Sequence, residues 1–319
     1  MKMRHAASAA ILAASALAAF AQDYPAKSIT FVVPFAAGSA TDQLARGLGQ
    51  SVATDTKQAV VVDNKPGASG FLAAQYVAKA APDGYTVLIT TNTTHAANEH
   101  LYKTLPYDPV KDFAPVTLLG KGGQVMIVNL KVPAKTVKEF IALAKKEPGK
   151  YTFGSGSSSS RIAGELFQQM ADVKLLHVPY KSNPLAVTDL LGGQIDMMIT
   201  DTATGLPQVK GDKVRALGMS SLKRSALAPD VPTIDEAGVK GYEMTYWFAA
   251  YVPAKTPPAA VKRLHDLLVA ATKSASAKTF YESSGADAVV STPEELAKFQ
   301  VAESQKWGKI IKAAGIQPE

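Results

Sequence analysis

Short apolar runs alternate with amphipathic stretches along most of the chain, and this pattern is typical of an α/β protein. In the first half it predicts strands at residues 29–35, 60–63, 86–90 and 116–119, separated by helices at 42–53, 69–80 and 95–102. In the second half it predicts strands at 151–154, 175–178, 195–200 and 214–219, with helices at 161–171 and 184–191 and a short turn at 206–209. The sequence therefore predicts two similar units in tandem with mostly parallel sheets.

One further strand follows each unit, at residues 125–129 and 246–252. If each inserts into the sheet of the other unit, the chain crosses between the units near 120–123 and again within 229–241. This arrangement predicts a hinged two-domain clamp with two inter-domain crossovers. The predicted parts are a signal peptide at 1–21, domain I at 23–122 plus 243–319, and domain II at 123–242.

The last part of the chain is predicted to be helical and to pack on domain I. Pro257 and Pro258 open one helix, Pro293 opens another, and Trp307 lies in the latter. Proline is favoured in the first turn of a helix, where its missing N–H has no intrahelical role.

The first residues have the composition of a secretory signal peptide. Lys2 and Arg4 precede an apolar stretch at 6–19, and Ala19 and Ala21 give the small-residue pattern at which such peptides are cut. We predict cleavage near Ala21 and export to the periplasm. The chain contains no cysteine, which excludes disulfides and thiol chemistry.

The charge of the chain favours small anions over large polyanions as partners. The formal net charge is +7, and it falls to +5 without Lys2 and Arg4. The basic residues are scattered along the predicted helices and are not interleaved with aromatic residues, so nucleic-acid binding is not predicted. A mild positive field attracts small anions.

Loops rich in hydrogen-bond donors follow several predicted strands. After the first strand, Gly38 and Ser39 are expected to leave backbone N–H groups open at a helix N-terminus, which is a favourable site for an anion. An ordinary turn, with Ser39 as the N-cap and Asp42 as its partner, is the alternative. Residues 91–94 follow the third strand, and 154–160, which could instead be a flexible linker, follow the first strand of the second unit.

Ligands bind beyond the carboxyl ends of parallel strands, so the loops of both units are expected to face one cleft. Trp247 and Phe248 are either core aromatics or walls of this cleft. Arg161 is either a solvated residue or a partner for an acidic group of the ligand. The helix dipole disfavours a cation at a helix start, and this points to a functional reason for an arginine there. His177 is interpreted as a structural histidine.

Catalytic signatures are missing from the sequence. It has no Gly-x-Ser-x-Gly segment, no P-loop, no His-Glu-x-x-His and no complete dinucleotide fingerprint. We therefore predict that the chain is not an enzyme and uses no cofactor and no metal. A periplasmic hydrolase with a nucleophile among the serines of 155–160 remains an alternative.

Many short segments, taken in order, resemble one known family: the periplasmic substrate-binding receptors of tripartite tricarboxylate transporters, also called Bug-type receptors. The segments that carry the resemblance are Tyr24-Pro25, Val-Pro-Phe-Ala-Ala-Gly at 33–38 with Asp42 and Arg46, Val-Asp-Asn-Lys-Pro-Gly-Ala at 62–68, Ala-Pro-Asp-Gly-Tyr-Thr at 81–86, Tyr-Asp-Pro at 107–109, Lys-Asp-Phe at 111–113, His-Val-Pro-Tyr-Lys at 177–181, Asp-Leu-Leu-Gly-Gly-Gln at 189–194, the ten residues 229–238 and Trp247-Phe248.

The resemblance implies a two-domain periplasmic binding-protein fold of the Venus-flytrap type. It also implies that the chain holds a small organic carboxylate, a dicarboxylate or an aromatic acid, and delivers it to a membrane permease. Ser182 and Asn183 stand where the family usually has glycine, and Arg161 stands where a histidine is frequent. These departures concern selectivity, so the identity of the ligand is not inherited.

The leading hypothesis is therefore a monomeric receptor without catalytic activity. A module that senses a ligand for a membrane kinase is the second hypothesis. The residues predicted to bind the ligand are Phe35, Ala37, Gly38, Ser39, Thr91, Thr93, Ser155, Ser157, Ser158, Ser159, Arg161, Lys181, Asp201, Trp247 and Phe248.

Overall fold

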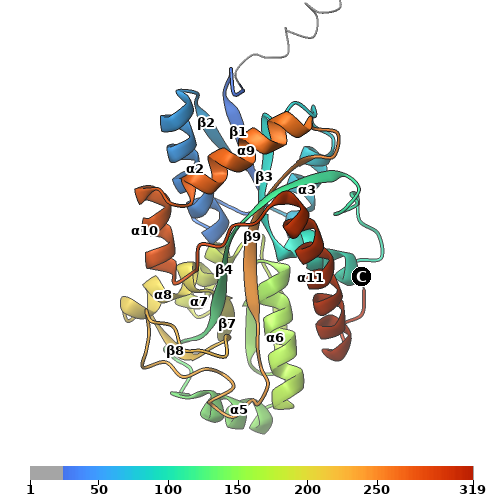
Figure 1. Ribbon diagram of the computed structural model, residues 1–319. Helices are drawn as coiled ribbons and strands as arrows, with labels where there is room; N and C mark the ends of the chain where they lie inside the picture. Colours follow the sequence, from blue (N-terminus) through green and yellow to red (C-terminus); the bar gives the residue numbers. More distant parts are fainter. Residues whose placement is uncertain (1–23, 319) are drawn as a thin grey trace, which may run out of the picture.

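The computed structural model describes residues 24–318, so the predicted signal peptide lies outside the described residues. The first half of the molecule has three parallel strands, which are covered by helices on both faces (Figure 1). Its elements in chain order are β1 (Ile29–Val33), α2 (Ala40–Thr56), β2 (Val60–Asn64), a 3₁₀ turn at Ala68–Gly70, α3 (Phe71–Ala78), β3 (Thr86–Thr91), a π-helical turn at Thr93–Ala97 and α4 (Asn98–Leu101).

The second half repeats this plan at the other end of the molecule (Figure 1). Its elements are α5 (Val137–Lys146), β5 (Thr152–Ser155), α6 (Ser158–Ala171), β6 (Leu176–Pro179), α7 (Asn183–Gly192), β7 (Met197–Asp201), α8 (Thr202–Lys210) and β8 (Val214–Met219). Strand β5 pairs in parallel with both β6 and β7.

Two long strands join the halves. Strand β4 (Phe113–Asn129) is continuous through the glycines at 120–123, where the sequence predicts a break between two strands. It pairs with β9 (Thr245–Pro253) as far as Gly123, and from Gln124 onward it pairs with β7 and β8. The first crossing therefore lies inside a strand. The backbone hydrogen bonds to neighbouring strands keep the glycines at 120–123 extended, although glycine has no side chain to favour that conformation.

The predicted position of the second crossing, within 229–241, is wrong. This segment still belongs to the second half, since Thr233 bridges to Met219 and the N–H of Met244 donates to the carbonyl of Ser220. The chain returns through β9, which pairs with β3 and β4. Because β4 and β9 run antiparallel to their neighbours, the sheet is mixed rather than mostly parallel.

Apolar side chains fill both faces of the sheet, which explains the nearly continuous apolar runs. In β1, Phe31 and Val33 belong to the core under α2, α9 (Pro258–Ala271) and α10 (Ala275–Ser284), whereas Val32 points to the opposite face. Trp307 lies in α11 (Pro293–Ala313) on that opposite face, and the helix begins with a complete capping box of Thr292 and Glu295. Helices α5 and α10 are not predicted from the sequence.

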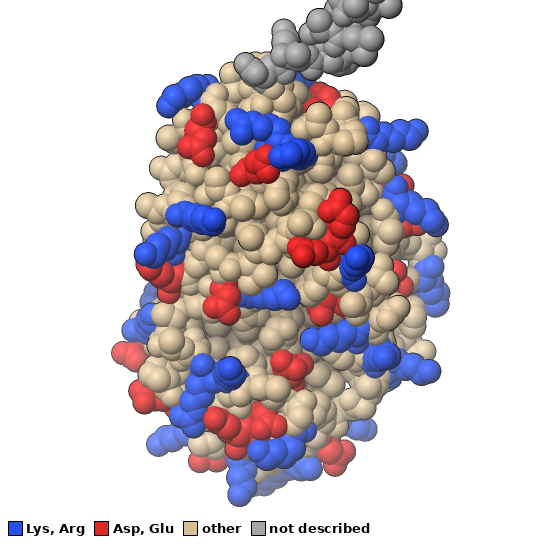
Figure 2. All heavy atoms as spheres, in the orientation of Figure 1, with Lys and Arg blue, Asp and Glu red and all other residues tan. Residues whose placement is uncertain are grey.

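The surface carries charges of both signs. Lys and Arg side chains alternate with Asp and Glu side chains over the face shown in Figure 2. Within residues 24–318, every helix falls short of the length or the apolar character that a bilayer crossing needs.

The contact between α6 and β5 leaves no room for a side chain at Gly164. A Cβ atom there would lie 2.4 Å from the ring of Phe153. We expect Gly164→Ala to lower the free energy of unfolding by about 1–3 kcal/mol, the usual effect of overpacking a core, measured by urea denaturation. Gly192→Ala is the matched control, because a Cβ at Gly192, also in a helix, meets no atom within 4 Å. Equal stability of the two variants would contradict this packing.

Candidate ligand-binding site

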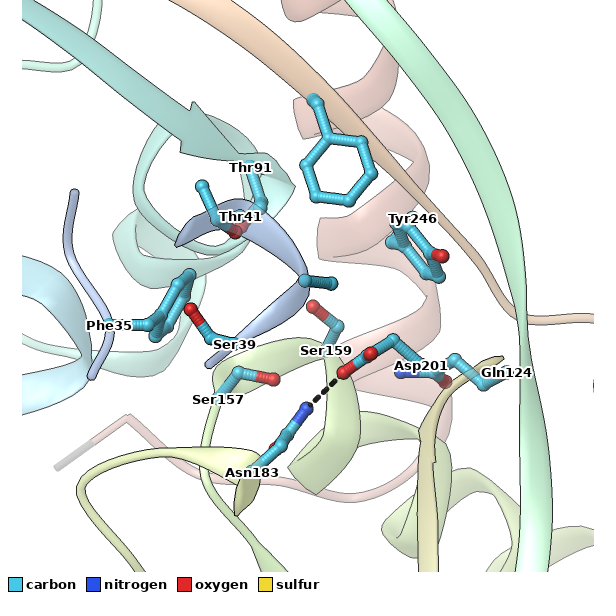
Figure 3. A pocket seen from close by; sticks show the side chains of 12 residues that line it. Phe35, Ser39, Thr41, Thr91, Gln124, Ser157, Ser159, Asn183, Asp201 and Tyr246 are labelled. Atoms are coloured by element: carbon cyan, nitrogen blue, oxygen red, sulfur yellow. Dashed lines mark hydrogen bonds between the residues drawn. The ribbon is translucent and has the colours of Figure 1, made fainter. Parts of the chain in front are cut away.

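A cavity lies between the two halves, where the loops after their strands meet. The space between its lining atoms, open solvent at the mouth included, is about 390 Å³. Its lining residues come from both halves (Figure 3): Phe35, Ser39, Ala40, Thr41, Thr91, Gln124, Ser157, Ser159, Asn183, Asp201, Tyr246 and Phe248.

Helix α2 presents its N-terminus to the cavity. Ser39 is its N-cap and accepts a hydrogen bond from the N–H of Asp42, and the lining residues Ala40 and Thr41 are the first two helical positions. Their N–H groups have no intrahelical acceptor, because the first turn of a helix has none. The positive end of the helix dipole therefore faces the cavity through open donors.

The N–H groups of Gly38 and Ser39 are predicted from the sequence to be open, but both are occupied. The N–H of Gly38 donates to Asp42 Oδ2 at 2.9 Å, and the N–H of Ser39 donates to the carbonyl of Ala36. Gly38 has a φ of 81°, a conformation that glycine adopts without strain. The open donors therefore lie two residues further along the chain, at Ala40 and Thr41.

Asp42 is a buried carboxylate that holds this loop in place. Arg46 binds both of its oxygens, with its NH2 group 2.9 Å from Oδ1 and its Nε 3.1 Å from Oδ2, and Asn64 Nδ2 donates to Oδ1 at 2.9 Å. Burial acts to raise the pKa of Asp42, but the hydrogen bonds from Arg46, Gly38 and Asn64 together lower it below its usual value. Because Arg46 neutralises Asp42, the loop can still accept an anion.

Three helices of the second half also begin at the cavity. Ser157 is the N-cap of α6, Asn183 is the first residue of α7, and Asp201 is the N-cap of α8. The loop before α6 approaches the start of α7 so closely that a Cβ at Gly156 would lie 1.9 Å from the carbonyl carbon of Ser182. Glycine at this position lets the two helix starts lie side by side.

The pKa of the Tyr246 hydroxyl is raised by burial and by the nearby carboxylate of Asp201, and a hydrogen bond with Thr202 opposes this only in part, so the hydroxyl keeps its proton. A buried polar atom without a partner also lies at the cavity. The Oε1 atom of Gln124 makes no hydrogen bond within the part of the chain that the structure describes. Such atoms are costly in a folded protein unless a ligand or water satisfies them.

Direct hydrogen bonds between the halves surround the cavity. Ser158 Oγ donates to Asn98 Oδ1 at 2.7 Å, and Ser159 Oγ lies 3.2 Å from Asn92 Nδ2 and 3.3 Å from Thr93 Oγ1. The serine tract is therefore the first turn of α6, not a flexible linker. The molecule is in a closed arrangement in which both halves contact each other beside the cavity.

The structure brings together seven of the predicted residues at the cavity: Phe35, Ser39, Thr91, Ser157, Ser159, Asp201 and Phe248. The others lie outside the lining. Ala37, Gly38 and Lys181 are exposed, Arg161 lies on the first turn of α6, and Thr93 and Ser158 join the two halves.

Two of the predicted residues outside the lining have clear structural roles. The indole of Trp247 donates from Nε1 to Glu303 Oε2 at 3.0 Å, because it points to the face of β9 opposite Tyr246 and Phe248. Ser155 Oγ lies 2.7 Å from His177 Nε2, and its β5 strand pairs with β6, where His177 lies. Neither residue of this pair is part of the cavity lining.

Five lining residues are absent from the predicted set: Ala40, Thr41, Gln124, Asn183 and Tyr246. Tyr246 could have been found from the alternation of β9, since Phe248 on the same face was predicted. Gln124 could not have been found in this way. It reaches the cavity because β4 continues unbroken across the crossing, which the sequence does not predict. Among residues 24–318, no group of three or more His, Asp, Glu or Cys side chains could hold a metal ion.

The fold and the cavity define the class of protein. Two α/β halves joined by crossing strands, with a cavity between them lined from both sides, form the periplasmic binding-protein fold, and the prediction of this fold class is confirmed by the similar solved structures. The sequence profile described as "Tripartite tricarboxylate transporter family receptor" matches residues 44–316. The chain belongs to this family, as the resemblance of its loops predicted.

Similar proteins cover nearly the whole chain. Protein BugT of Bordetella pertussis is 32% identical, over 92% of this chain and 91% of its own length. The structure of Rpa4515 from R. palustris with adipate has a TM-score of 0.90 and 34% identity, covering 93% of this chain and all of that one. MatC from Rhodopseudomonas palustris with bound malate has a TM-score of 0.85 and 29% identity, and the match covers 90% of this chain and 100% of that one. These neighbours are binding proteins rather than enzymes.

The Asp42 network makes stability depend on acidity. The pKa of Asp42 is lowered by folding from 3.8, so its charged form stabilises the fold above that value, and this contribution is lost as the pH falls through the folded pKa. We expect Asp42→Asn to be destabilised relative to the wild type at neutral pH, with a gap that narrows below about pH 4. Urea denaturation from pH 7 downward measures the gap. Asp55→Asn, at an exposed position of the same helix, is the control, and a gap for Asp42→Asn that is constant with pH would contradict the expectation.

Proposed function

We propose that the chain is a periplasmic receptor that closes on one small organic carboxylate and delivers it to the membrane permease of a tripartite tricarboxylate transporter. The observation that carries the proposal is the α2 N-terminus, which faces the cavity with open N–H groups at Ala40 and Thr41. An anion is stabilised there without a basic side chain. The bound adipate and malate of two similar proteins support a carboxylate as the class of ligand.

The domain organisation follows from this proposal. One lobe comprises residues 23–122 and 243–319, and the other comprises 123–242, with the hinge where β4 and β9 pass between them. Closure is driven by a ligand that contacts both lobes, because only the closed state satisfies both sets of contacts. Dicarboxylates and aromatic acids of a size that fits the cavity are the candidate ligands, and the chain is proposed to act as a monomer without a cofactor.

The proposed location is the periplasm, reached through a signal peptide at residues 1–21 that is cut near Ala21. The family to which the chain belongs works at a membrane transporter, and its receptors are periplasmic. No observation favours the kinase-sensor hypothesis over transport.

A thermal-shift screen tests the proposal. We expect at least one member of a panel of C4 to C6 carboxylates, citrate and benzene carboxylates to raise the melting temperature, since a ligand that binds only the folded state stabilises it. A flat response over the whole panel, with the protein folded, would contradict the function.

The loop before α2 is tested with Ser39→Asp. Aspartate caps a helix as well as serine does, so the variant keeps its stability. Its charge opposes an anion at the α2 N-terminus, so we expect carboxylate binding to weaken by about 10- to 100-fold by calorimetry. Ser274→Asp is the matched control, because Ser274 is the N-cap of α10 outside the cavity lining. Unchanged affinity in Ser39→Asp would remove this loop from the site.

The serine-hydrolase alternative is tested by chemical labelling. Since the Ser155 and His177 pair is not part of the cavity lining, we expect a serine-reactive fluorophosphonate to leave the protein unlabelled. Mass spectrometry of the intact protein is the measurement. Stoichiometric labelling that Ser155→Ala abolishes would contradict the assignment as a receptor without catalytic activity.

A further inference from the structure

The two ends of the cavity differ in chemistry. The end formed by α2 offers hydrogen-bond donors, namely the N–H groups of Ala40 and Thr41. The opposite end is formed by Gln124 of β4 and Asp201 of β7, which lie opposite each other in the register of the two strands and close together in Figure 3. A ligand that spans the cavity meets the backbone donors of α2 at one end. At the other end it meets the carboxylate of Asp201 beside the hydroxyls of Ser157 and Ser159, which can donate or accept.

The carboxylate of Asp201 is held in one orientation. Its Oδ1 accepts from the N–H of Thr204 at 2.8 Å, and its Oδ2 accepts from Asn183 Nδ2 at 2.8 Å. The amide of Asn183 cannot turn around, because its Oδ1 accepts from the N–H of Gly156 at 3.0 Å. Each carboxylate oxygen has two lone pairs, so Oδ1 keeps acceptor capacity for a further donor.

Gln124 adds a second polar group beside Asp201. Its side chain is 2% exposed, and its Oε1 atom has no hydrogen-bond partner among the described residues. Its amide can present either the oxygen or the NH2 group to the cavity. Asp201 is therefore the acceptor that sets the chemistry of this end, and Gln124 is a buried polar neighbour that a ligand can satisfy.

The charge balance points the same way. The cavity lining, all of it within residues 24–318, includes the carboxylate of Asp201 and no Lys or Arg. An ionised group at the far end of a ligand would lie against this carboxylate with no cation in the lining to separate them. Like charges placed opposite each other in a binding site oppose binding.

We propose that the ligand of this receptor is a short carboxylic acid whose far end carries an O–H or N–H donor, a hydroxyl or an amino group, in place of a second ionised carboxylate. Asp201 and Gln124 are the residues that select this end. The inference rests on the proposed function, because it takes the first carboxylate to be bound at the N-terminus of α2. It narrows the candidate ligands within the class of small carboxylates.

A matched ligand series tests this selection. The probes are linear C4 to C6 acids that differ only at the far end: α,ω-dicarboxylates, ω-hydroxy acids, ω-amino acids and plain monocarboxylates. Calorimetry at pH 7 measures each with the wild type. We expect the tightest donor-ended acid to bind at least about tenfold better than the dicarboxylate of equal length, because of the opposing charge of Asp201.

The variant Asp201→Asn removes the charge at this end. Asparagine keeps an oxygen for the N–H of Thr204, but its NH2 group then faces Asn183 Nδ2, so thermal unfolding is used to check that the variant is folded. In the folded variant, the preference for the donor-ended acid over the dicarboxylate should fall by about tenfold or more. Gln124→Glu, which adds a charge beside Asp201, should increase the preference for the ω-amino acid. Asp108→Asn is the matched control, since Asp108 also accepts backbone N–H groups but lies outside the cavity lining.

The outcomes distinguish the two proposals. A dicarboxylate that binds as well as the donor-ended acid, or an unchanged preference in folded Asp201→Asn and Gln124→Glu, overturns the inference and leaves the carboxylate receptor intact. If no acid of the series or of the wider panel binds the folded wild type, the proposed function fails, and the inference fails with it.

Discussion

The pairing of β4 with β9 is the constraint on which the rest of the structure depends. Strand β4 pairs with β9 in the first half and with β7 and β8 in the second, so a single backbone is hydrogen-bonded to both sheets. The 17 residues of β4, at roughly 3.3 Å each, reach over both halves of the molecule. The lining residues Gln124, Tyr246 and Phe248 lie on this strand pair itself, where it passes from one half to the other.

The proposed binding of an anion in this cavity rests on backbone geometry. The N-termini of α2, α6, α7 and α8 all reach the lining, which includes no Lys or Arg. At the N-terminus of α8, the carboxylate of Asp201 already accepts a helix N–H. At the N-terminus of α2, Arg46 neutralises the carboxylate of Asp42, so the positive end of the helix can still attract an anion. When the cavity closes without a ligand, backbone N–H groups are left buried without an acceptor. This costs less free energy than leaving a lysine or arginine side chain buried without a counter-ion.

Much of the fold follows from local sequence. The apolar runs of β1, β3 and β7 and the capping residues of α2 and α11 predict their elements, because burial on both faces and cap hydrogen bonds leave local signatures. The continuity of β4 through its glycines could not be predicted, since it depends on pairing with β9, which is more than a hundred residues away. For the same reason Gln124 was missed, whereas Ser39 and Ser157, which are N-caps, were identified.

The hydrogen bonds of Ser158 and Ser159 to Asn98 and Asn92 do not involve a ligand. They therefore favour the closed form whether or not the cavity is filled. A protein that already closes in part when empty leaves less conformational work to its ligand, which raises the apparent affinity. A partner that recognised the closed shape would then also meet closed molecules without a ligand. The strength of these serine–asparagine contacts thus bears on how faithfully the closed shape reports a bound ligand.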